Sequence, residues 1–114
     1  MNKQYRVKRS DEIEAILKAK KSYSNKYFVV YKKENCEALN FRYAISVGKK
    51  LGNAVMRNRV KRQMRAIIDS LIVPDLKMDV FVVARPSVSG LAYAQMYQNI
   101  IYLFNKLNIQ HKGA

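Results

Sequence analysis

The stretch that decides the fold is residues 53–71, which reads NAVMRNRVKRQMRAIIDSL. Its apolar residues recur every three or four positions, the spacing that places side chains on one face of an α-helix. At about 100° per residue, one stripe is formed by Met56, Val60, Met64, Ile67 and Leu71. The pattern predicts a helix over about 54–71, capped by Asn53 and closed before Pro74, that packs this stripe on a sheet.

The opposite and flanking sides of the same helix are basic. They carry Arg57, Asn58, Arg59, Lys61, Arg62 and Arg65. Lys49 and Lys50 lie just before the helix start, where backbone N–H groups and the helix dipole also attract anions. Such crowded positive charges repel one another, whereas arginine forks match phosphate oxygens. The helix therefore favours RNA binding over the simpler interpretation, an outer face that is only solvated.

Three further stretches read as strands. Residues 27–31 are aromatic and β-branched, and residues 41–47 alternate between apolar and polar. A polar turn at 34–37 predicts that these two strands pair as an antiparallel hairpin. Residues 80–84 form a continuous apolar run, which is typical of a buried strand.

Two more helices complete the expected elements. The first covers about 10–20, with Ser10 as its N-cap, and the last covers about 92–107. Residues 1–9 are expected to be a basic arm, and the tail at about 110–114 is expected to be loose. With 114 residues and no linker or repeat, the chain is predicted to be one domain.

The charge balance points to an anionic partner. Lys and Arg number 22 against 8 Asp and Glu, a net charge of +14, and eight of those fourteen charges fall in residues 38–68. Nucleic acid is the first expectation and a membrane surface the second. No apolar run approaches the roughly 20 residues that span a bilayer. One cysteine, Cys36, and one histidine, His111, give neither a disulfide nor a zinc site, so we expect a cytoplasmic protein.

Residues 49–65, KKLGNAVMRNRVKRQMR, closely resemble the signature of the bacterial ribonuclease P protein subunit, and Arg57-Asn58-Arg59 matches that family's RNR motif. The likeness extends over nearly the whole chain, through residues 5–8, 25–31, 41–47, 83–85 and the closing helix.

This resemblance implies a fold and an activity. The fold is α+β: a single-domain α/β sandwich with helices on a four-stranded, mostly antiparallel sheet and a left-handed βαβ crossover, although right-handed crossovers are the general rule. The protein would be a cofactor of the ribonuclease P ribozyme, whose RNA removes the 5′ leader of precursor tRNA by endonucleolytic hydrolysis. No side chain would be catalytic. Mg²⁺ would be bound mainly by the RNA, with no metal site in the protein and no small-molecule cofactor.

The resemblance also assigns partners and residues. The partners are ribonuclease P RNA and precursor tRNA, with no membrane and no required protein partner. Binding of the RNA subunit falls to Lys49, Lys50, Asn53, Arg57, Asn58, Arg59, Lys61, Arg62 and Arg65. The leader would lie between the first helix and the exposed sheet face, against Ile13, Leu17, Tyr27, Phe28, Tyr31, Arg42 and Ser46. Additional basic candidates are Arg6, Lys8 and Arg85.

Several aromatic residues allow two interpretations. Phe28 is either a core residue or a leader contact, whereas Tyr31 is expected at the surface. The last helix is expected to bury Tyr93, Tyr97 and Phe104 and leaves Tyr102 open to either role. Family members often carry aromatic residues at the positions of Ile13 and Leu17, and aliphatic side chains stack poorly on bases.

Two other functions compete with the ribozyme cofactor. A structural RNA-binding protein of the ribosomal type would show the same charge. A self-sufficient nuclease would need carboxylate clusters or a well-placed histidine. The acids here lie mainly at a helix start and in turns, which disfavours that class.

Overall fold

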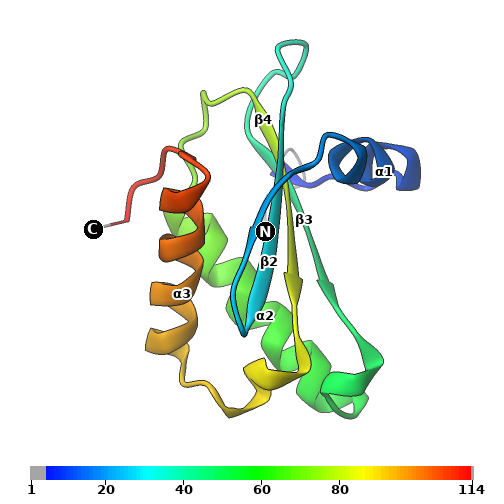
Figure 1. The fold of residues 1–114 in the computed structure, drawn as a ribbon, viewed down its shortest axis with the longest axis vertical. Helices are drawn as coiled ribbons and strands as arrows, with labels where there is room; N and C mark the ends of the chain where they lie inside the picture. Colours follow the sequence, from blue (N-terminus) through cyan, green and yellow to red (C-terminus); the bar gives the residue numbers. More distant parts are fainter. Residues whose placement is uncertain (1–4, 114) are drawn as a thin grey trace.

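Three α-helices and four strands make up residues 5–113, the part of the chain that the structure, a computed structural model, describes (Figure 1). In order they are α1 (Ser10–Lys18), β1 (Lys21–Ser24), β2 (Phe28–Glu34), β3 (Arg42–Val47), α2 (Ala54–Leu71), β4 (Met78–Ala84) and α3 (Tyr93–Lys106). Two short 3-10 helices precede α2 and α3, namely η2 (Lys49–Leu51) and η3 (Pro86–Gly90). This is the predicted α+β architecture of helices on a four-stranded sheet.

The strands lie in the order β1-β2-β4-β3. β4 runs parallel to β3 and antiparallel to β2, and β1 pairs antiparallel with β2. The β3–α2–β4 segment is therefore the parallel βαβ unit that the resemblance predicts. The hand of its crossover stays a prediction.

The predicted hairpin between residues 27–31 and 41–47 is wrong, because β4 lies between β2 and β3 and pairs with both. Val80 and Val82 of β4 are fully buried, and a strand buried in this way belongs at the centre of a sheet. Alternation along a strand gives the face of each side chain but does not give its neighbour. β1 is absent from the sequence predictions because its four residues, KSYS, are polar or aromatic and all exposed.

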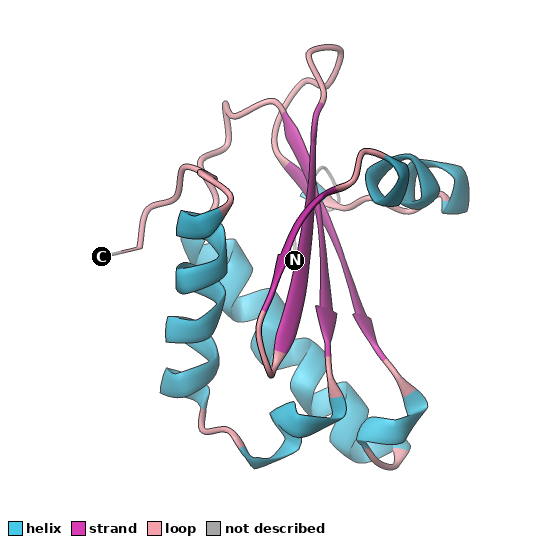
Figure 2. Ribbon diagram, viewed as in Figure 1, coloured by secondary structure: helices cyan, strands magenta, loops and turns pink. Residues whose placement is uncertain are grey.

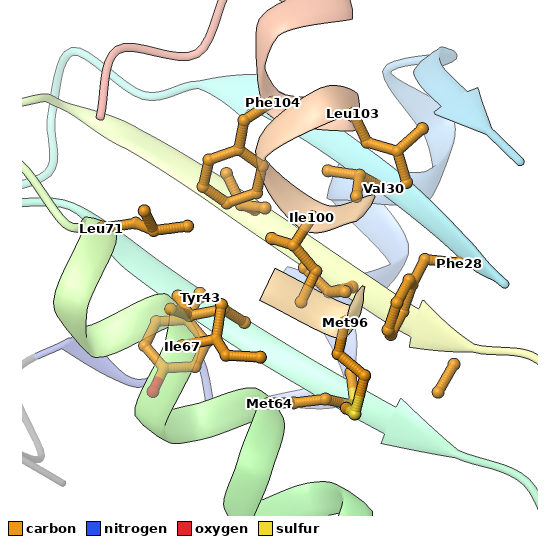
Figure 3. Close-up of a cluster of buried hydrophobic side chains, with 14 of the residues drawn as sticks. Phe28, Val30, Tyr43, Met64, Ile67, Leu71, Met96, Ile100, Leu103 and Phe104 are labelled. Carbon is orange, nitrogen blue, oxygen red and sulfur yellow. The ribbon is translucent and has the colours of Figure 1, made fainter. Parts of the chain in front are cut away.

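The main core lies between the sheet and the pair α2 and α3, which cover the same sheet face (Figures 1 and 2). Val60, Met64, Ile67 and Leu71 of the predicted stripe are buried, and Met56 packs against them. Figure 3 shows side chains from β2, β3, α2 and α3 meeting in this layer. The stripe therefore fixes which side of α2 faces outward.

α1 lies on the opposite face of the sheet (Figure 2). Its one buried residue, Ile16, packs with Val7 and Ala44 in a small second cluster. α1 ends at Lys18, two residues earlier than expected, and Arg9 instead of Ser10 occupies the N-cap position without a side-chain cap bond. One short helix covers only part of this sheet face.

Both ends of the described chain are held by backbone hydrogen bonds. The Val7 N–H donates to the Tyr43 carbonyl at 2.9 Å, so the arm is docked from there, while residues 1–4 lie outside the described part. The expectation of a loose tail is wrong for residues 110–113. The Lys112 N–H donates to the Leu71 carbonyl at 3.0 Å, and buried Ile109 anchors the segment.

Candidate nucleic-acid interface

The start of α2 is fixed by local hydrogen bonding. The side-chain oxygen of Asn53 accepts the N–H of Met56 at 2.9 Å, which confirms the predicted cap. Gly52 adopts a φ of 157° and lies 3.2 Å from Met56 atoms when a Cβ is built on it, so a side chain there would crowd the helix. Lys49 and Lys50 are exposed on η2, directly before the helix N-terminus.

The outward side of α2 is cationic, as its sequence predicts. Asn58, Arg59 and Arg62 are exposed, whereas Arg57, Lys61 and Arg65 are half-buried along the flanks. Within residues 5–113, the side-chain ion pairs join Arg9 to Asp11 and Arg42 to Glu12 and Asp79, so none involves an α2 cation. No ion pair within residues 5–113 therefore offsets their mutual repulsion, and a polyanion would relieve it.

Arg57 carries a further cost. Its Nε is buried and has no hydrogen-bond partner among the described residues. A buried, unpaired donor costs about 1–3 kcal/mol. This unpaired donor is consistent with a side chain kept for binding instead of for stability.

Two adjoining hollows connect the arm to α2. One, of about 540 Å³, is lined by Arg6, Lys8 and Ile13 on one side and by Tyr43 and Arg65 on the other. The second, of about 480 Å³, is lined by Arg6, Arg62, Arg65, Ala66 and Asp69. Arg6 and Lys8 thus extend the basic surface of α2 toward α1. This brings together residues that the sequence predicts for the RNA subunit and for the leader.

Tyr43 is a buried residue that lines the first of these two hollows. Its hydroxyl donates to Asp69 Oδ1 at 2.7 Å. Burial, followed by the bond to Asp69, raises the pKa of Tyr43 well above its ordinary value of 10.0. Asp69 is thus tied to the sheet at the far end of α2 instead of pairing with Arg62 or Arg65.

The sheet face beside α1 holds part of the predicted leader set. Ile13 of α1 and Tyr31 of β2 pack on the small second cluster, and Leu17 is 39% exposed beside them on α1. Ser46 is half-buried on β3, on the same sheet face. Phe81, which the sequence analysis did not single out, stacks on Tyr31 with ring centroids 6.0 Å apart. Its alternation within the apolar run 80–84 was the signal that could have found it.

Phe28 does not belong to this face, which corrects its assignment as a leader contact, whereas Tyr27 is half-buried and its leader contact stays a prediction. Phe28 is 0% exposed and lies in the main core, because its position on β2 alternates with Val29 and Tyr31. Tyr27 precedes β2 and packs against the same main core. The Asn25 side chain accepts the N–H groups of both residues at 2.9 Å and fixes this turn.

Arg42 is neutralised by its neighbours. Its Nε and Nη2 donate to Asp79 at 3.0 and 2.9 Å, and Nη2 also lies 2.7 Å from Glu12 Oε2. The hydrogen bond to Asp79, which outweighs desolvation, raises the pKa of Arg42 above its ordinary value. Asn35 donates to the same carboxylate at 3.1 Å. We therefore assign Arg42 to clamping α1 on the sheet, a network whose acids sequence reasoning missed.

Two candidates remain, Arg85 and His111, and Arg85 follows the end of β4 that pairs with the end of β3, next to η2. Arg85 is exposed after β4, and its backbone N–H donates to the Tyr27 carbonyl at 2.8 Å. His111 Nε2 lies 2.7 Å from the Asn105 side-chain oxygen. Among residues 5–113 no group of three His, Cys, Asp or Glu side chains could hold a metal ion. In the same range, no helix has both the length and the apolar character needed to span a bilayer.

Known proteins share this sequence and fold. A family model described as Ribonuclease P matches residues 1–108. The ribonuclease P protein component of Streptococcus pneumoniae (strain Hungary19A-6) is 42% identical over 116 aligned positions, covering 99% of this chain and 92% of that protein. The solved structure of Staphylococcus aureus RNase P protein superposes with a TM-score of 0.82 at 32% identity, over 92% of this chain and 96% of that one. The RNase P protein from Thermotoga maritima gives a TM-score of 0.71 at 25% identity, over 85% and 92% of the two chains.

Proposed function

Because the chain belongs to the ribonuclease P protein family, we propose that it binds the ribozyme RNA through α2 and holds the 5′ leader of precursor tRNA beside α1. The RNA subunit carries out the endonucleolytic cleavage that gives the mature tRNA 5′ end, and the catalytic Mg²⁺ is bound mainly by that RNA. The protein contributes no acid, base or nucleophile. It screens phosphate repulsion and orients the substrate.

One observation carries this proposal: the outward side of α2 has five arginines and lysines and no ion pair within the described residues. They are Arg57, Arg59, Lys61, Arg62 and Arg65. Each phosphate that they neutralise releases counterions and adds a salt-dependent increment to the affinity. Lys49, Lys50 and Asn58 extend the same surface to the helix start, while Asn53 supports it by capping the helix.

The proposed leader site comprises fewer of the residues that the sequence predicted. Its apolar floor comprises Ile13, Leu17, Tyr31 and Phe81, and Ser46 adds a hydroxyl at its side. Arg6 and Lys8, which line the groove toward α2, supply cations in place of Arg42. A leader strand in this position would run from the α1 face toward the surface bound by the RNA subunit.

Cleavage of precursor tRNA by the RNA subunit at limiting Mg²⁺, with and without the protein, tests the proposal. We expect faster cleavage with the protein present. The double variant Arg59→Gln/Arg62→Gln should lower the slope of log affinity against log salt for the RNA subunit by about 1.4–1.8, since each lost contact removes about 0.7–0.9. The matched control is Lys77→Gln/Lys112→Gln, which removes the same charge from exposed positions outside the proposed surfaces.

Three results would count against the proposal. Equal slopes for the two double variants would reject α2 as the binding surface. Tight RNA binding without any stimulation of cleavage would instead support a structural RNA-binding protein. Cleavage by the protein in the absence of the RNA subunit would revive the self-sufficient nuclease.

A further inference from the structure

Two exposed tyrosines meet at the edge of the sheet that lies farthest from β3. Tyr23 of β1 is 41% exposed and Tyr102 of α3 is 47% exposed, and their rings form an edge-to-face pair with centroids 6.5 Å apart. The Nζ of Lys106 lies 5.9 Å from the centre of the Tyr23 ring and 5.4 Å from that of Tyr102. Tyr23, Tyr102 and Lys106 therefore form one cluster at this edge.

The fold holds the Tyr23–Tyr102–Lys106 cluster in place. Tyr23 pairs with Val30, whose side chain is buried in the main core, so both side chains are on the α3 face of the sheet. Tyr102 and Lys106 are four residues apart, which places them on one side of α3. The Nζ of Lys32 on β2 also donates to the carbonyl of Leu107 and so ties the end of α3 to the sheet.

The segments that form the Tyr23–Tyr102–Lys106 cluster carry lysines and no acidic residues. Residues 15–33 and 80–114 contain no Asp or Glu, so neither β1 nor α3 carries an acid. Lys21 lies two residues before Tyr23, on the same side of β1, and is exposed. The ammonium groups of Lys21 and Lys106 therefore have no carboxylate on β1 or α3, the two elements that form the cluster.

The Tyr23–Tyr102–Lys106 cluster lies away from α1 and from the start of α2. α1 is on the other face of the sheet (Figure 2). α2 and α3 run side by side, because η2 contacts η3 where they begin and the Lys112 N–H reaches the Leu71 carbonyl where they end. Lys106 is in the last turn of α3, whereas Arg57 and Arg59 are in the first two turns of α2, so about the length of a helix separates Lys106 from these two arginines.

We infer that the Tyr23–Tyr102–Lys106 cluster is an additional contact for single-stranded RNA. One or two bases stack on Tyr23 and Tyr102, while Lys106 pairs with the phosphate between them. Exposed aromatic rings beside cations are the common platform for unpaired bases, and stacking accepts any base. The contact between the rings and the lysine holds the platform ready, which reduces the ordering cost of binding.

A protein partner fits this surface less well. A stable protein interface buries about 800 Å² on each side around an apolar centre. The other large apolar side chains that are exposed in the described residues, Leu17, Leu39, Val55 and Tyr93, are elsewhere on the chain. Two rings under a lysine form too small an apolar area for such an interface, but they match the size of one or two bases.

The inference is tested on the full-length protein with a fluorescein-labelled ten-nucleotide oligouridylate, measured by fluorescence anisotropy. Tyr23→Ala/Tyr102→Ala should weaken binding about fivefold or more for each ring that a base occupies. Tyr93→Ala is the matched control, because Tyr93 is 44% exposed on the same helix and has no ring or cation contact among residues 5–113. Tyr23→Phe/Tyr102→Phe keeps the rings and should bind as the unmodified protein does.

A photocrosslinking experiment locates the contact. An oligouridylate that carries 4-thiouridine should crosslink to peptides from residues 21–24 and 93–106, and those crosslinks should disappear in Tyr23→Ala/Tyr102→Ala. Lys106→Gln should reduce the salt slope by about 0.7, the value for one lost contact to a single strand, and Lys106→Arg should restore it. Thermal unfolding of each variant shows that the fold is retained.

The inference is overturned if crosslinks appear only in α1 and α2, or if Tyr23→Ala/Tyr102→Ala binds the oligouridylate as Tyr93→Ala does. A change of oligomeric state in the double variant without a change in oligouridylate affinity would identify a protein contact and would also overturn it. None of these outcomes depends on precursor tRNA cleavage, so the inference and the proposed function can fail separately.

Discussion

Asp79 is the buried acid of the described structure, and it is the residue on which the seating of α1 depends. Asp79→Asn removes the charge that faces the Arg42 guanidinium and leaves that cation with Glu12 alone. Breaking a buried pair from one side costs about 3–5 kcal/mol; since Arg42 keeps Glu12, we expect a loss of about 3 kcal/mol in the free energy of unfolding, measured by urea titration. Asp75→Asn, at an exposed acid that forms no ion pair with any residue of the described range, is the control, and equal losses would refute the clamp.

Tyr43 makes stability depend on alkaline pH. Because its folded pKa is raised, the folded chain keeps a proton that the unfolded chain releases above about pH 10. Its contribution to stability is complete below pH 10 and falls as the pH rises, by about 1.4 kcal/mol at pH 11. In Tyr43→Phe this decrease should be absent. Urea titrations of both proteins at pH 9 and pH 11 measure this difference, because all other groups titrate alike in the two proteins. Equal decreases in the free energy of unfolding would contradict the assignment.

At the scale of the element, α2 was the most predictable part of the chain. Its helical period gives the buried stripe and the cationic side, and the residue type of Asn53 gives the cap. The strands were harder, because each residue of a strand has one of two faces and either edge can pair. Phe28 illustrates this: its aromatic character suited both a core and a leader contact, and only the packing of β2 under α3 decided between them.

α1 offers the sharpest test of the proposed leader site, because the residues proposed to contact the leader from α1, Ile13 and Leu17, are aliphatic. Leu17→Tyr adds a ring at a position that is already 39% exposed, so it enlarges no core residue. A stacked base contributes about 1–3 kcal/mol, and we expect the affinity for precursor tRNA with a ten-nucleotide leader to rise at least about fivefold. Binding of mature tRNA should not change.

Leu39→Tyr is the control for this experiment, since Leu39 is 93% exposed in the loop between β2 and β3. Equal gains for the two variants would mean that any exposed ring attracts the leader. No gain for Leu17→Tyr would move the leader away from α1.

For the whole molecule, composition predicted an anionic partner, nucleic acid first, but it did not predict how the chain closes on itself. The tail was expected to be loose because residues 110–114 are polar or small, yet Gly113 packs so closely on Leu71 and Ile101 that a Cβ there would lie 2.6 Å from Leu71. The ion pairs of Arg42 join three segments that are distant in sequence. Contacts of this kind follow from the topology, which local patterns of polarity and charge leave open.

The net charge of +14 predicts that salt acts in opposite directions on folding and on binding. The Debye length falls from about 30 Å at 0.01 M to about 8 Å at 0.15 M, that is, from above the 13.2 Å radius of gyration to below it. Repulsion across the molecule should be screened over this range, so the unfolding temperature should rise by a few degrees while affinity for the RNA subunit falls. Thermal unfolding and binding titrations at both salt concentrations measure the two effects. Arg59→Gln/Arg62→Gln should gain less in unfolding temperature, because two of the crowded charges are gone, and a fall in unfolding temperature with salt would show that self-repulsion does not limit this fold.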